Sequence, residues 1–155
     1  MTTATSGTGT SGTGLSVVRA AGLLATHLTG HGLPEPVSLI VTTGWEQVKV
    51  SAQLPCATVP EVAGDLLAWI NTLGTVTVQA WRPPEGDRVH LSIAAILADL
   101  VDAVELNVFA GAKDDPALFA DLNPGERRAV SLDELRGWTV PATASPVPEA
   151  PEAQR

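Results

Sequence analysis

The fold follows from residues 76–109, VTVQAWRPPEGDRVHLSIAAILADLVDAVELNVF. Three runs in this stretch alternate apolar and polar side chains, which is the pattern of strands that bury one face. Their apolar sets are Val76/Val78/Ala80, Val89/Leu91/Ile93 and Val104/Leu106/Val108. The proline- and glycine-containing residues 82–87 predict a turn between the first two strands. Residues 95–102 fit a strand or a helical turn, and this stretch of sequence leaves both open.

Two further strands are predicted before this stretch. Val37, Leu39 and Val41 occupy alternate positions, and the same spacing of apolar residues continues in residues 48–54 after a tight connection at Thr43-Gly44. Pairing Thr42 with Trp45 places Leu39 opposite Val48. Both apolar sets then lie on one face of the sheet, which favours this register.

Helices are predicted around these strands. Residues 15–31 have helical apolar spacing and end at Gly32, a typical residue for the left-handed position after a helix. Thr58 and Glu61 form a capping box that starts a helix running to about Thr72. Asp115-Pro116 predicts a short helix, and Ser131 with Glu134 predicts a last helix ending near Trp138. The predicted class is α+β, with helices packed on a mainly antiparallel sheet of about five strands in the order α-ββ-α-βββ-α.

The two ends of the chain have a different composition. Residues 1–14 are rich in Thr, Gly and Ser, and residues 139–155 are rich in Pro and Ala. Neither end has a periodic apolar face, so both are predicted to be disordered tails. Residues 15–138 are then a single α+β domain.

Composition limits the classes of function. Nine Lys and Arg against seventeen Asp and Glu give a net charge of −8, which disfavours nucleic acid and anionic membranes as partners. The apolar stretch 92–112 is interrupted by three acidic residues, so no membrane span is predicted. The first residues lack the charge and apolar block of a signal peptide, and we expect a cytoplasmic protein. Arg outnumbers Lys, Tyr is absent, and Ala, Val, Thr, Gly and Pro are abundant, which is typical of a high-GC bacterium or its phages and mobile elements.

The candidate chemical groups are few. Gly7, Gly9 and Gly12 spell a dinucleotide-binding pattern, but no residues precede them that could form the required strand. His27 and His31 are spaced to share one helix face and are the candidate metal ligands, yet a metal site needs at least a third ligand. We therefore predict no metal and no cofactor.

Cys56, the only cysteine, comes just before a predicted helix, where a thiol can be activated. No local motif joins it to a histidine base, so catalysis by Cys56 is the alternative and a structural thiol the favoured interpretation. The acidic cluster of Asp114, Asp115, Asp121 and Glu126 lacks calcium-loop spacing, and Asp115 is better interpreted as a helix cap.

The outer face of the predicted sheet is the candidate binding surface. Pairing Trp81 with Arg88, and Ile93 with Val104, gives three outer rows: Trp81/Arg88/Phe109, Gln79/His90/Asn107 and Thr77/Ser92/Glu105. Arg88 would then lie between two aromatic rings. The predicted protein-binding residues are Trp81, Arg88, His90 and Phe109. Two interpretations stay open, a protein-binding surface or a second small core covered by the helix that ends near Trp138.

The sequence thus favours a non-catalytic binding or accessory module whose partner is another protein or a second copy of the chain. A small enzyme using Cys56 or a histidine, and a regulator that contacts nucleic acid, are the alternatives.

Overall fold

A computed structural model of the chain describes residues 15–44, 47–99 and 102–139. Over these residues the chain is α+β, with four helices and a six-stranded mixed sheet. The elements are α1 (Val17–His31), β1 (Ser38–Thr43), β2 (Val48–Gln53), α2 (Val59–Ile70), β3 (Val76–Trp81), β4 (Arg88–Ala98), β5 (Ala103–Lys113), α3 (Pro116–Phe119), β6 (Arg127–Val130) and α4 (Leu132–Trp138). The predicted tails lie outside the described residues except for Thr139, whose N–H donates to the carbonyl of Arg136.

The strands lie side by side in the order β1-β2-β5-β4-β3-β6. All neighbours are antiparallel except β2 and β5, which are parallel because α2 carries the chain across the sheet from β2 to β3. The sheet therefore has one strand more than predicted and is mixed. The strand that the sequence analysis missed is β6, which pairs with β3.

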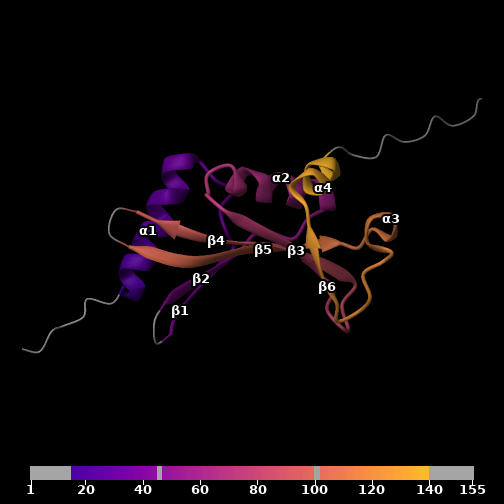
Figure 1. Cartoon of the computed structure of the whole chain (residues 1–155), viewed down its shortest axis with the longest axis horizontal. Helices are drawn as coiled ribbons and strands as arrows, with labels where there is room; N and C mark the ends of the chain where they lie inside the picture. Colours follow the sequence, from indigo (N-terminus) through magenta and orange to yellow (C-terminus); the bar gives the residue numbers. More distant parts are fainter. Residues whose placement is uncertain (1–14, 45–46, 100–101, 140–155) are drawn as a thin grey trace, which may run out of the picture.

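Helices α1, α2 and α4 form the helical layer of the fold, and the short α3 lies beyond the β3–β6 end of the sheet (Figure 1). Helices α1 and α2 pack directly on the strands, and α4 packs on α2. The sheet is bowed, so that the β1–β2 hairpin and the β6 edge both bend away from the helical layer (Figure 1). No helix of the described residues is long and apolar enough to cross a membrane.

Local signals in the sequence fix the helix ends as expected. Gly32 ends α1 in the left-handed conformation with φ of 59°. The Thr58 N–H donates to the Glu61 carboxylate at 2.9 Å, which completes the predicted capping box of α2. Asp115 accepts from the N–H of Ala117 and caps α3, and Ser131 accepts from the N–H of Glu134 and caps α4.

The core lies between the helices and the inner face of the sheet. The predicted inward side chains of β3, β4 and β5 are all buried except for Val76, which is half-buried against them. Trp69 of α2 is fully buried above them. Of the segment 95–102, whose structure the sequence left undecided, residues 95–98 continue β4, since Ala95 and Leu97 are buried and Ala98 pairs with Ala103; residues 100–101 lie outside the described part of the chain.

The three predicted strand registers are wrong, each by an even number of residues. Leu39 pairs with Ala52 instead of Val48, Trp81 with His90 instead of Arg88, and Ile93 with Val108 instead of Val104. An even shift keeps every side chain on its predicted face but changes its neighbours across the strands. The division between core and outer face is therefore correct, and the three predicted outer rows are not.

Candidate binding groove on the outer sheet face

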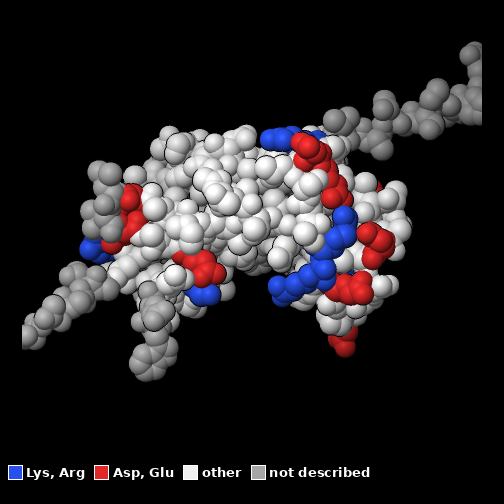
Figure 2. Space-filling view, in the orientation of Figure 1, with Lys and Arg blue, Asp and Glu red and all other residues white. Residues whose placement is uncertain are grey.

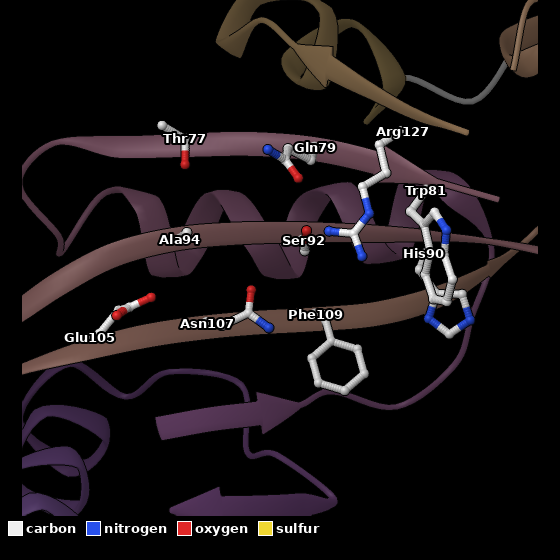
Figure 3. A pocket seen from close by; sticks show the side chains of 10 residues that line it. All are labelled: Thr77, Gln79, Trp81, His90, Ser92, Ala94, Glu105, Asn107, Phe109 and Arg127. Atoms are coloured by element: carbon white, nitrogen blue, oxygen red, sulfur yellow. The ribbon is translucent and has the colours of Figure 1, made fainter. Parts of the chain in front are cut away.

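The outer face of the sheet is hollowed into an open groove of about 440 Å³. Side chains from four strands line it and are shown in Figure 3: Thr77, Gln79, Trp81, His90, Ser92, Ala94, Glu105, Asn107, Phe109 and Arg127. Small residues such as Ser92 and Ala94 form its floor on β4, and α2 lies behind the sheet in this view. The hollow results from the bowed sheet together with these small central side chains.

Three rings gather at one end of the groove. Trp81 of β3 and His90 of β4 are paired across the strands, with ring centroids 5.4 Å apart. The Phe109 ring on β5 lies 6.4 Å from that of His90. All three are half-buried. They form a staggered aromatic surface that a ligand can contact from the open side.

A cation–π contact exists at this end, but its cation is Arg127 and not Arg88. Arg127 of β6 pairs with Trp81, and its guanidinium carbon lies 5.4 Å from the centroid of the indole ring. Figure 3 shows the Arg127 side chain extending from β6 over β3 toward the middle of the groove. Among the residues that the structure describes, no carboxylate lies within ion-pair distance of Arg127.

Arg88 itself lies outside the groove. It is the first residue of β4, where it pairs with Lys113 beyond the aromatic end of the groove, and it is exposed, with the Asp87 carboxylate at 4.0 Å. The position opposite His90 is taken by Gly111. A Cβ atom there would lie 3.1 Å from the Cys56 sulfur and 3.8 Å from the His90 ring, so the glycine makes room for both side chains.

The groove becomes polar away from the rings. The row next to Trp81 and His90 consists of Gln79, Ser92 and Phe109, and the row after it consists of Thr77, Ala94 and Asn107. Beyond them, Lys49 and Glu105 face each other on β2 and β5 and form an ion pair at 3.0 Å. Figure 2 shows that further charged side chains gather around β6 and α4. One end of the groove therefore carries the Lys49–Glu105 ion pair, whose charges compensate each other. The other end carries Arg127, which has no carboxylate partner among the described residues.

His90 favours its neutral form in this setting. Burial against its neighbours lowers the pKa of the imidazole below the ordinary 6.5, and the positive charge of Arg88 lowers it further. At neutral pH the ring is thus uncharged and can stack with aromatic or apolar groups. Arg127 is then the cation that faces into the groove.

The expectation that the last helix covers this face is wrong. Helix α4 lies on the helical side of the sheet, where it packs on α2, and Trp138 contacts Phe119 edge-on with ring centroids 5.2 Å apart. No helix in the described residues lies over the groove (Figure 1). Within residues 15–44, 47–99 and 102–139, the groove residues thus lie on the face that the helices leave open.

His27 and His31 share one face of α1, with ring centroids 4.6 Å apart. Thr72 donates its hydroxyl proton to the Trp69 carbonyl, so the contact of 2.9 Å between His27 Nε2 and Thr72 Oγ1 has the histidine as donor. That nitrogen is not free for a metal. No group of three potential ligands occurs in the described part of the chain.

Cys56 is exposed just before α2 and lines a separate shallow depression with Arg88 and Lys113. No hydrogen bond joins its sulfur to a histidine of the described residues, so the arrangement lacks the nucleophile–base pair of a thiol enzyme. In the acidic cluster, Asp114 holds Arg82 through two contacts of 2.6 and 2.9 Å, and Asp121 lies near Arg128. These carboxylates are used within the fold.

The groove residue that sequence reasoning missed is Arg127. Its strand is only four residues long and begins with two arginines, so alternation in Arg127–Val130 was too short to be recognised. In the structure Val130 is buried and Arg128 half-buried, while Arg127 and Ala129 face out; the four letters RRAV carry no alternation that would have predicted this.

No protein-family model, curated protein or solved structure matches this chain significantly.

Proposed function

We propose that this chain is a non-catalytic binding module that holds a segment of a partner protein in the groove on its outer sheet face. The observation that carries the proposal is the uncovered aromatic end of the groove, where Trp81, His90 and Phe109 lie beside Arg127. Tryptophan and arginine are the residues most enriched where binding energy concentrates in protein interfaces.

The chemistry of the lining defines the segment. Arg127 offers a guanidinium without a carboxylate partner among the described residues, which favours an Asp or Glu side chain in the ligand. The three rings favour an apolar or aromatic side chain next to that carboxylate. The amides of Gln79 and Asn107 can both donate and accept hydrogen bonds, which suits the peptide backbone of an extended segment.

A random-peptide phage library selected on the immobilised protein tests this proposal. We expect enriched peptides that combine an acidic residue with a neighbouring apolar or aromatic one. Synthetic copies should bind Trp81→Ala and Arg127→Ala at least about tenfold more weakly than the unchanged protein. Arg88→Ala is the matched control, because Arg88 lies outside the groove and should leave affinity unchanged.

Amide chemical shifts would locate the bound peptide. Shift changes confined to β3, β4, β5 and β6 support the proposal. Absence of any enriched peptide, or peptides that bind the Trp81 and Arg127 variants as well as the unchanged protein, would overturn it.

A further inference from the structure

The two edges of the sheet differ in how they are protected. β6 is four residues long, carries two arginines, and is held by the ion pair between Arg128 and Glu134 at 2.6 Å. β1 is six residues long and reads SLIVTT, with no charge and no proline. Short strands, charges and prolines are the devices that normally keep an edge from pairing with another chain. β1 has none of the three.

The free backbone groups of β1 can be identified. At the end of the β1–β2 hairpin the Gly44 N–H donates to the Gln47 carbonyl at 2.9 Å. Bonded and non-bonded positions alternate along an antiparallel pair. The N–H and C=O groups of Leu39, Val41 and Thr43 therefore point away from β2, toward the open edge.

The side chains of this strand are also exposed. Leu39 is 48% exposed on the helical side and Ile40 is 57% exposed on the groove side. A strand added along the edge would cover both. Since exposed apolar side chains flank a row of free backbone groups, the edge has the features of a β-pairing interface.

We propose that β1 pairs with β1 of a second copy of this chain, in antiparallel orientation about a two-fold axis at Val41. Val41 then exchanges hydrogen bonds with Val41 of the second copy, and Leu39 does so with Thr43. A second copy fits this edge because it supplies the same row of outward N–H and C=O groups in the antiparallel direction. The net charge of −8 opposes self-association, and it does so least here, because β1 is uncharged and the nearby Lys49–Glu105 pair is compensated.

The pairing would join the two sheets and set the two outer grooves side by side. The inference is independent of the proposed function, because Trp81 on β3 and Arg127 on β6 lie near the sheet edge opposite to the β1 edge. The dimer would present two copies of the groove to a partner, and occupancy of one is not needed for its formation.

Sedimentation velocity over a concentration series tests the pairing. We expect a reversible dimer for the unchanged chain. Val41→Pro removes the outward N–H from both copies without breaking a bond to β2, and should weaken the dimer at least about tenfold. Leu39→Lys should do the same, because it replaces an apolar side chain of the pairing edge with a charge in each copy, which would have to lose its hydration when the edges meet.

Two controls keep the test specific. Ala129→Lys adds the same charge at the β6 edge and should leave the dimer intact, as should Trp81→Ala in the groove. Circular dichroism of each variant checks that the fold persists. A monomeric unchanged chain at millimolar concentration, or a dimer that resists both β1 substitutions, would overturn the proposal.

Discussion

The two faces of the sheet are built from the same strands, and neighbouring residues on one strand have opposite environments. On β5, Leu106 is fully buried beneath the helices, while the next residue, Asn107, lines the open groove. The buried face consists almost entirely of aliphatic side chains, whereas the open face carries rings, amides, small residues and ions. The buried face supplies most of the packing that stabilises the fold, and the open face carries the side chains of the proposed binding groove.

The largest expected difference between the faces concerns two tryptophans. Trp69 is fully buried on α2, and Trp81 is half-buried in the groove. Trp69→Ala should lower the free energy of unfolding by about 3–5 kcal/mol, because it leaves a cavity in the core. Trp81→Ala should lower it by about 1 kcal/mol or less. Urea unfolding of both variants measures the difference, and equal losses would show that the groove is part of the core.

A smaller difference is expected between two arginines. Arg82 is held by Asp114 through two hydrogen bonds and also donates to the Phe119 carbonyl at 3.2 Å, with both charged side chains mostly buried. Arg82→Ala should cost about 2 kcal/mol because it leaves Asp114 without its partner. Arg127→Ala on the open face should change stability by about 0.5 kcal/mol or less. The urea midpoints should keep this order, and a reversed order would contradict the division of roles.

His27 on α1 and His90 on the outer face of β4 both have a lowered pKa. Burial lowers the pKa of both His27 and His90 below 6.5. As the pH falls through about 6.5, the histidines are protonated in the unfolded chain before they are protonated in the folded one. The free energy of unfolding therefore decreases until the pH lies below the pKa values of the folded state. His27→Gln and His90→Gln should each make this decrease shallower, as measured by unfolding midpoints at neutral and mildly acidic pH.

Peptide binding separates these two histidines. A bound peptide should further disfavour protonation of His90 if the ring becomes more buried, so affinity should fall on acidification in the unchanged chain and less so in His90→Gln. His27→Gln should behave like the unchanged chain. Equal behaviour of the two variants would show that the groove does not bind through this ring.

The smallest expected effect is that of zinc. His27 Nε2 already donates to Thr72, and the described residues offer no group of three ligands. Adding Zn²⁺ or EDTA should therefore leave the thermal midpoint unchanged. A midpoint that rises with Zn²⁺ and loses that rise in His27→Ala would show a metal site.

The sequence predicted which face of the sheet each side chain occupies better than it predicted which residues lie opposite each other on adjacent strands. Every inward side chain of β4 and β5 that alternation selected is buried, because a period of two needs no knowledge of the partner strand. The registers depended on loop lengths, and these were misjudged where the β4–β5 hairpin continues to its turn between Asp99 and Asp102. Trp81, His90 and Phe109 were therefore placed on the correct face. Arg88 was given the position opposite Trp81 on β4 that His90 holds, and the cation beside Trp81 is Arg127 of β6.

What the sequence by itself determined is local: the caps of α1, α2, α3 and α4, the alternation of the strands and the α+β class all follow from side-chain chemistry within a few residues. Only the tertiary structure decided the parallel pairing of β2 with β5, the recruitment of Arg127–Val130 as an edge strand, and the packing of α4 on the helical side. These features depend on contacts between residues far apart in the chain, and the free energy of such contacts comes from burial in the assembled core. A four-residue strand is also too short to show a periodic pattern in the sequence.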